Sequence, residues 1–245
     1  TWRDTHEQRG VRFVEAEDVG DRITLSDATG RTMSFTGRQR RMALDYLDIR
    51  VPIYIDITGM SYVAWAPTIR ALVEAGAKVV AIYAEPIDYR RSKTPTRGML
   101  FDLSEGFEGL RPLPGFATLG TQATADWHLV AALGFEGSRF SHVINELEPA
   151  SEHIVPVIGV PAFRPEFATQ AFVANRADLD DPVVATRIRF ARANCPFDLF
   201  HTLHAIHQDL ADAPLRVAPI GTKPHGLGAV LYAMSRPSHV QLVYD

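Results

Sequence analysis

Residues 54–86 read YIDITGMSYVAWAPTIRALVEAGAKVVAIYAEP and hold the pattern that decides the fold. With the preceding IRVPI, the apolar, β-branched run that ends at Asp56 is typical of a parallel strand buried on both faces. Apolar residues then recur at helical spacing until Gly76, which suits the position just after a helix. The run AKVVAIYAEP predicts a second strand. Together these elements predict a βαβ unit with a right-handed crossover.

Pro67 leaves the start of this helix open. Proline is favoured in the first turn of a helix, so the helix begins near Ala66, unless Pro67 kinks a longer helix that begins near Ser61. The two alternatives differ in the length of the loop that follows the first strand.

The same alternation of strands and helices is predicted in the second half of the chain. WHLVAALGF, SRFSHVINELE and HIVPVIGVP predict a strand, a helix and a strand, and ATQAFVANR, VVATRIRFARAN and FDLFHTLHAIHQDLAD predict helices. LRVAPIG, TKPHG, LGAVLYAMSRP and HVQLVYD then predict a strand, a loop, a helix and a final strand. We therefore expect a Rossmann-like α/β fold, with a mainly parallel sheet and helices on both faces.

Two parts of the chain depart from this rhythm. Short β-branched runs broken at Gly20 and Gly30 predict hairpin-linked strands, so residues 1–37 are expected to form a small β element beside an α/β domain over residues 38–245. Residues 87–127 are rich in Pro, Gly, Arg and Thr and have no sustained period, which predicts either a functional loop that covers the site as a lid or a partly disordered stretch.

The composition bounds the class of protein. The 245 residues are 46% hydrophobic and 22% charged, which is typical of a globular protein and excludes disordered and fibrous classes. The single cysteine, Cys195, excludes a disulfide framework. A net charge of −4 argues against a protein that coats duplex nucleic acid, and no apolar run is long enough to span a membrane. We expect a cytoplasmic protein.

The chain starts without Met and stops directly after an apolar run. We therefore also expect flanking sequence, with either an attached effector domain or a separate partner protein that acts with this chain.

Ligands of open α/β sheets bind beyond the carboxyl ends of the strands, where loops lead into helices. The loop after the first strand offers Thr58, Gly59 and Ser61. A glycine for close backbone approach, two hydroxyls and the N–H groups of a helix start together suit a phosphate. The alternative is that the glycine serves the turn and the hydroxyls cap the helix. Neither a GxGxxG nor a Walker A motif is present.

Two later loops add charge in front of helices. GTKPHG offers a cation and a titratable imidazole, and a Lys-Pro-His triplet has no evident structural purpose in a tight loop. GFEGSR offers two glycines and a Glu and Arg that are spaced to pair with one another. The residues expected to line the site in these two loops are Thr222, Lys223, His225, Gly134, Glu136, Gly137 and Arg139.

Asp56 and Glu85 follow two strands that are expected to be neighbours, so their carboxylates are expected to face one cleft. Such a pair holds a ribose, positions water or binds Mg²⁺. If the chain is an enzyme, these two residues and His225 are its candidate catalytic groups. The alternatives are helix capping or a loop hydrogen bond for Asp56 and simple solvation for Glu85.

No metal site is expected. His201, His204 and His207 lie three residues apart on a predicted helix, and each offset of three turns the helix by about 300°, so the outer two histidines point in different directions. The sequence indicates no particular cofactor.

The order of strand, Thr-Gly loop, helix and strand in residues 54–86 resembles the N-terminal half of the CARF and SAVED type of Rossmann-like domain, a ligand-sensing module of prokaryotic antiviral systems. The resemblance, which extends to the terminal βαβ unit, implies loops that bind a cyclic or linear oligonucleotide second messenger, usually across a dimer. Met60 departs from the family loop, which often carries further glycines or threonines. The residues that the resemblance places against the ligand are Thr58, Gly59, Ser61, Lys223 and His225.

The leading interpretation is a nucleotide-binding regulatory or sensor domain of a prokaryotic defence-type protein, with a phosphate-bearing, nucleotide-like small molecule at the strand-end loops. The first alternative is a nucleotide- or nucleoside-processing hydrolase that uses Asp56 and Glu85. The second is a protein-interaction scaffold. We expect a homodimer, and neither duplex nucleic acid nor a membrane as a partner. The identity of the ligand stays open.

Overall fold

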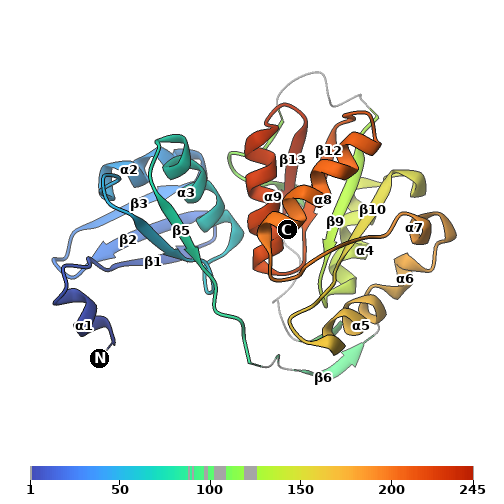
Figure 1. Cartoon of the computed structure of the whole chain (residues 1–245), viewed down its shortest axis with the longest axis horizontal. Coiled ribbons are helices and arrows are strands. Elements are labelled where there is room, and N and C mark those ends of the chain that lie inside the picture. The colour runs from blue at the N-terminus through green and yellow to red at the C-terminus, as the bar shows by residue number, and fades with distance from the viewer. Residues whose placement is uncertain are drawn as a thin grey trace. The chain divides into compact units, whose positions relative to one another are not determined.

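The chain divides into two compact units, Thr1–Tyr83 and Ala84–Asp245, in the computed structural model shown in Figure 1. This boundary differs from the division predicted after residue 37. The β element and the first strand–helix–strand stretch belong to the same unit. The structure describes residues 2–87, 89, 91–96, 99–101, 109–118 and 126–244.

The first unit holds an antiparallel sheet and a parallel strand pair. Strands β1, β2 and β3 pair in chain order as the predicted hairpins, and β4 pairs with β5 in parallel. The helix predicted after residue 37 is divided into a 3₁₀ helix, η1, and one turn of α-helix, α2. The elements are α1 (Trp2–Glu7), β1 (Val14–Val19), β2 (Arg22–Asp27), β3 (Thr32–Thr36), η1 (Gly37–Met42), α2 (Ala43–Tyr46), β4 (Ile53–Asp56), α3 (Tyr62–Glu74) and β5 (Val79–Ile82).

One apolar core explains why the β element is not a separate appendage. Ile23, Leu25 and Phe35 of the antiparallel sheet pack with Tyr46 of α2 and Ala64 of α3. A small sheet with one apolar face needs a partner to cover that face. The helices supply it, so the unit extends to the end of β5.

The β4 strand is less buried than its sequence predicts. Ile55 is buried, but Tyr54 is 65% exposed, so the prediction of a strand buried on both faces is wrong. The reason is that β4 has β5 as its one described neighbour, and the pair does not belong to the larger sheet. Helix α3 begins at Tyr62 with Pro67 inside it, so the longer of the two predicted helices forms.

The second unit is built around a six-stranded sheet. Its strand order is β11-β10-β9-β12-β13-β8, in which β8 is antiparallel to β13 and the other neighbours are parallel. The elements are β6 (Arg91–Thr96), β7 (Met99–Phe101), β8 (Arg111–Pro112), β9 (His128–Leu133), α4 (Gly137–Leu147), η3 (Ser151–His153), β10 (Ile154–Gly159), α5 (Pro165–Ala174), α6 (Arg176–Leu179), α7 (Pro182–Thr186), β11 (Arg189–Ala191), α8 (Pro196–Asp209), β12 (Leu215–Pro219), α9 (Lys223–Ser235) and β13 (Val240–Tyr244).

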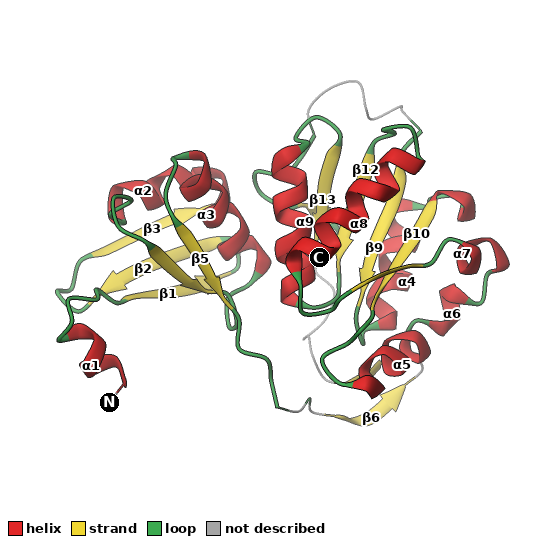
Figure 2. Cartoon of the chain, viewed as in Figure 1, coloured by secondary structure: helices red, strands yellow, loops and turns green. Residues whose placement is uncertain are grey.

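Helices cover both faces of this sheet. Figure 2 shows α8 and α9 in front of the strands and α4 behind them. On the α4 face, Phe140 and Val143 of that helix pack with Leu129, Leu133 and Ile158 of the strands. The α/β class with a mainly parallel sheet is therefore confirmed.

Two predicted elements of the second unit need correction. Residues 189–191 form β11, although VVATRIRFARAN was predicted as one helix; only Pro182–Thr186 of this region is helical. The stretch 87–127 was predicted to lack regular structure, but β6, β7 and β8 lie within it. Its prediction as a lid falls partly on positions outside the described residues.

Candidate functional site

The carboxyl ends of β9 and β12 meet through two glycines. A Cβ on Gly134, just after β9, would lie 2.9 Å from the carbonyl oxygen of Ile220. A Cβ on Gly221, just after β12, would lie 2.7 Å from the carbonyl oxygen of Leu133. Any larger residue at either position collides with backbone, so the two loops touch because both residues are glycine. The structure thus brings two of the three predicted loops together.

The loop after β12 is shorter than the sequence predicts, because Lys223 already belongs to α9. Thr222 caps this helix: its Oγ1 accepts a hydrogen bond from the backbone N–H of His225 at 3.3 Å and donates one to the carbonyl of Ala193 at 2.6 Å. Lys223 is half-buried in the first helical turn. The amino end of α9, where the helix dipole is positive, therefore carries an additional cation.

His225 has a structural position that the sequence does not reveal. It is fully buried, and its Nε2 lies 3.0 Å from the carbonyl oxygen of Arg192 in the loop between β11 and α8. Its Nδ1 has no hydrogen-bond partner among the described residues. Burial lowers the pKa of His225. The expectation that His225 lies in a loop is thus corrected, because His225 belongs to the first turn of α9 and joins this helix to the loop between β11 and α8.

The amino end of α4 carries the third predicted set of residues. Glu136 precedes the helix, and its Oε2 lies 3.5 Å from Nε of Arg139, so the predicted pairing is present. A Cβ on Gly137 would lie 1.8 Å from the carbonyl oxygen of Ala174. Gly137 thus allows α4 to contact the end of α5, which is a packing role.

Asn175 holds this loop in place and was missed at the level of sequence. It is buried, and its Nδ2 donates to the carbonyl of Gly134 at 2.8 Å and to that of Ala171 at 2.7 Å. An asparagine that follows a predicted helix usually suggests a helix cap. The bond to Gly134 spans 41 residues and could not be read from local pattern.

An aromatic cluster beside the same loop was also missed. The Phe135 ring lies 5.2 Å from the rings of both Tyr89 and Phe167, and Tyr89 lies 5.6 Å from Phe167. All three pairs have steep interplanar angles, which is the edge-to-face geometry that aromatic rings favour. The guanidinium of Arg164 lies 5.6 Å from the centre of the Phe167 ring. The chain that follows β5 therefore reaches the carboxyl edge of the second unit's sheet.

The loop with Thr58, Gly59 and Ser61 lies in the first unit, where two of its backbone N–H groups bond to carboxylates of the protein and the buried Oγ of Ser61 has no hydrogen-bond partner among the described residues. The backbone N–H of Thr58 donates to Oδ1 of Asp56 at 2.9 Å, and that of Ser61 donates to Oδ2 of Asp18 at 2.8 Å. A carboxylate of the protein thus already lies at the start of α3, where a phosphate was expected. Asp56 makes the loop hydrogen bond that was its alternative role.

Asp56 and Glu85 follow paired strands, as expected, because β4 and β5 are neighbours with Asp56 opposite Ile82. The division of the chain assigns Asp56 to the first unit and Glu85 to the second. That their carboxylates share one cleft stays a prediction.

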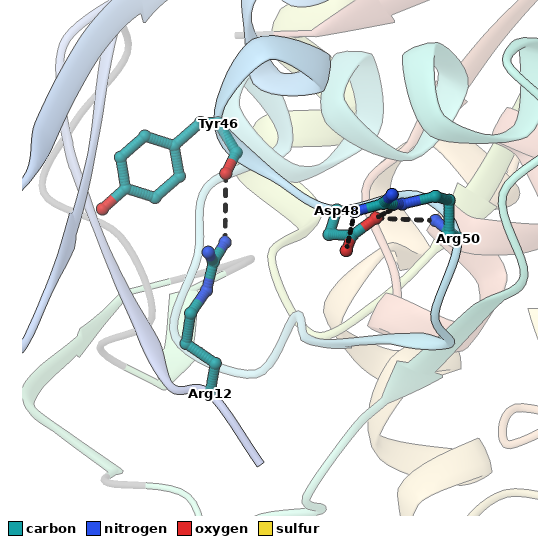
Figure 3. Close-up of polar contacts among 4 residues, drawn as sticks. All are labelled: Arg12, Tyr46, Asp48 and Arg50. Atoms are coloured by element: carbon teal, nitrogen blue, oxygen red, sulfur yellow. Dashed lines mark hydrogen bonds and ion pairs between the residues drawn. The ribbon is translucent and has the colours of Figure 1, made fainter. Parts of the chain in front are cut away.

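A separate polar cluster lies near the end of α2 in the first unit (Figure 3). Arg12 Nη2 donates to the carbonyl of Tyr46 at 3.0 Å, and the guanidinium of Arg31 stacks 4.5 Å from the centre of the Tyr46 ring. Beside it, Arg50 Nε donates to Oδ1 of Asp48 at 2.8 Å. These hydrogen bonds from Arg50 lower the pKa of Asp48 to about 2. The cations here bond to backbone carbonyls and to Asp48, which is a structural arrangement.

Neither a cluster of metal-ligating side chains nor a membrane-spanning helix is present among the described residues. They contain no group of three or more His, Cys, Asp or Glu side chains arranged to hold a metal ion. In that part of the chain, none of the helices has the length and apolar character required to span a bilayer. Comparisons with family models, with curated proteins and with solved structures find no match, so the candidate site is defined by its own geometry.

Proposed function

We propose that residues 84–245 form a Rossmann-like domain that binds a nucleotide-like, phosphate-bearing small molecule at the carboxyl ends of β9 and β12. Numbered along the chain, strands β9 to β13 lie in the order 3-2-1-4-5. This is the order of doubly wound sheets, which bind ligands in the crevice where the strand order reverses. In this sheet the reversal lies between β9 and β12.

The observation that carries the proposal is the contact between the Gly134 and Gly221 backbones at this reversal. On either side of the contact a helix begins, α4 at Gly137 and α9 at Lys223. The amino ends of helices present backbone N–H groups and a positive dipole end, both of which favour a phosphate. Lys223 adds a full positive charge at α9.

The two sides of the crevice differ in charge. Glu136 places a carboxylate at the start of α4, where Arg139 partly balances it. Lys223 places a cation in the first turn of α9, and Thr222 caps this helix through bonds to backbone groups. Because a cation and a positive helix end both favour an anion, we assign the phosphate to the α9 side. Glu136 lies on the side suited to hydroxyl groups, such as those of a ribose, which donate to a carboxylate.

The role of this site is regulatory binding rather than turnover. A sensor needs no catalytic carboxylate, and the carboxylate of Glu136, at the start of α4, is engaged by Arg139. His225 is buried and held by Arg192, so it is a support for α9. A defence-type sensor fits the part of the resemblance that extends to the terminal βαβ unit, which lies in the second unit with the proposed site.

Isothermal titration calorimetry of the full chain with AMP, ADP and cyclic di-AMP tests this function. At least one nucleotide should bind, and Lys223→Ala should weaken binding by about 10- to 100-fold, the range for loss of a hydrogen bond to a charged group. Lys78→Ala, which removes an exposed lysine in the first unit, is the matched control and should bind as the wild type does. Absence of binding by all three nucleotides, or equal affinity in Lys223→Ala, would contradict the proposal.

A further inference from the structure

The segment that connects the two units is attached to the candidate ligand loop. The first unit ends at Tyr83, and residues 84–87 and 89 have no helix or strand. Within the second unit, Tyr89 packs against Phe135 and Phe167. The Arg164 guanidinium donates a hydrogen bond to the carbonyl oxygen of Ile87. An aromatic contact at Tyr89 and a hydrogen bond at Ile87 thus attach the segment.

Both attachments lead to the carboxyl edge of the sheet. Phe135 lies between Gly134, which touches Gly221, and Glu136, which precedes α4. Arg164 precedes α5, and Phe167 lies in its first turn. The guanidinium of Arg164, which bonds to Ile87, also lies over the ring of Phe167, which contacts Tyr89. The polar and the aromatic contacts of the segment are therefore joined through these two side chains.

The Phe135 backbone cannot shift independently of the site. The carbonyl of the preceding residue, Gly134, accepts the buried Asn175 amide, and the Gly134 backbone lies against Gly221. A movement that frees Phe135 from Tyr89 therefore disturbs the residues proposed to hold the ligand. Conversely, a ligand that fixes residues 134–139 also fixes the Phe135 surface on which Tyr89 docks.

We propose that Tyr89 couples ligand occupancy at the β9/β12 crevice to docking of the segment between the two units. The inference rests on the proposed nucleotide function and names how that site is regulated. Linkage makes the coupling reciprocal: if docking of Tyr89 favours the ligand, the ligand favours docking by the same factor. The ligand state of the second unit is thereby transmitted to the chain that leads into the first.

Hydrogen exchange and calorimetry of the full chain test the coupling with one probe, an equimolar mixture of AMP, ADP and cyclic di-AMP. We expect the mixture to slow exchange of the amides of residues 134–139 and also of those of Ala84, Glu85 and Ile87. Tyr89→Ala should abolish the second effect and weaken nucleotide binding by about tenfold, within the usual range of allosteric coupling. Tyr89→Phe keeps the ring and should behave as the wild type does.

Two α5 variants separate docking from helix stability. Phe167→Ala removes a ring that contacts Tyr89 and should speed exchange of residues 84–87 even without nucleotide. Phe172→Ala removes a ring on the same helix that is 43% exposed, and should leave exchange of that segment unchanged.

The possible outcomes distinguish the two proposals. If the mixture protects residues 134–139 but Tyr89→Ala binds it as tightly as the wild type, the coupling is wrong and the nucleotide function stands. If residues 84–87 exchange at the same rate in wild type and Phe167→Ala, the docking itself is wrong. If the mixture neither binds nor protects residues 134–139, the nucleotide function is wrong and the coupling is overturned with it.

Discussion

Gly221 lies so close to Leu133 that a Cβ on the glycine would be 2.7 Å from the leucine carbonyl oxygen. Because this oxygen belongs to the backbone at the end of β9, the clash cannot be relieved by rotation of a side chain. Gly221→Ala should therefore lower the free energy of unfolding of the second unit by about 1–3 kcal/mol, the usual cost of overpacking. Urea denaturation of the wild type and of Gly221→Ala measures this difference in the free energy of unfolding.

The matched control for this change is Gly59→Ala. A Cβ at Gly59 would meet no heavy atom of the described residues within 4 Å. Gly59→Ala should therefore change the unfolding free energy much less than Gly221→Ala. Equal effects of the two substitutions would show that β9 and β12 do not approach each other as closely as described.

Asn175 is expected to position the loop after β9. In Asn175→Ala, the Gly134 carbonyl loses its buried amide donor, and unfolding should become easier by about 1–3 kcal/mol. Nucleotide affinity should fall as well, because Gly134 borders the proposed site. Asn194→Ala, at an exposed position of the same unit, should alter neither quantity. A stable Asn175→Ala protein with unchanged affinity would refute the positioning role.

His207 predicts how stability depends on pH. It is 1% exposed, its Nδ1 lies 2.7 Å from the Tyr232 hydroxyl, and burial lowers its pKa below the ordinary value of 6.5. The unfolded chain therefore binds a proton more readily than the folded one. The contribution of His207 to the free energy of unfolding should be fully present above the pKa of the unfolded chain. It should be lost as pH falls through about 6.5 toward the lower pKa of the folded protein.

Urea denaturation between about pH 8 and pH 5 checks this prediction. His207→Gln keeps a polar group for Tyr232 but does not titrate, so its stability should fall less steeply than that of the wild type as pH decreases. His201→Gln, at an exposed position of the same helix, should keep the wild-type slope. Identical slopes for wild type and His207→Gln would exclude His207 as a source of the pH dependence.

Asp48 gives an independent test in the first unit. Its pKa is lowered to about 2, first by the side-chain hydrogen bonds from Arg50 and then by the backbone N–H of the same residue (Figure 3). A carboxyl group whose pKa is lowered by folding stabilises the folded protein at pH values above its unfolded pKa. This stabilisation is lost as pH falls through about 2. Titration of the Asp48 carboxyl by NMR should give a midpoint near 2, which rises toward 3.8 in Arg50→Gln. A midpoint that is the same in both proteins would show that the ion pair does not form in solution.

Four strands of the larger sheet could be predicted because each of them carries a continuous apolar run. The runs that become β9, β10, β12 and β13 are buried along most of their length, and local sequence reports that burial directly. β11 escaped prediction because it has three residues, of which Arg189 and Phe190 are exposed. Its flanking residues also follow a helical period.

The division of the chain could not be predicted from local pattern. The sequences of β4 and β5 predict strands of a large parallel sheet. In the structure the two strands pair with each other and belong to the same unit as β1 to β3. The choice of strand neighbours depends on contacts between residues far apart in the sequence. The contact of Ile23 and Phe35 with Ala64 is of this kind.

The candidate site could be predicted only in part, because it too depends on contacts between residues far apart in the sequence. Loops that begin helices were identifiable from glycines, and the structure brings Gly134 and Gly221 together. The burial of His225 depends on Arg192, which lies 33 residues earlier. Ser61 was expected to bind a ligand, but it donates its N–H to Asp18, 43 residues earlier.

A crystal structure of the full chain grown with AMP, ADP and cyclic di-AMP tests the central claim most directly. The account predicts nucleotide density at the ends of β9 and β12, with a phosphate oxygen within hydrogen-bonding distance of Lys223 Nζ and of the backbone amides that begin α9. Density for the nucleotide at the loop of Thr58 and Ser61, with the β9/β12 crevice unliganded, would contradict it.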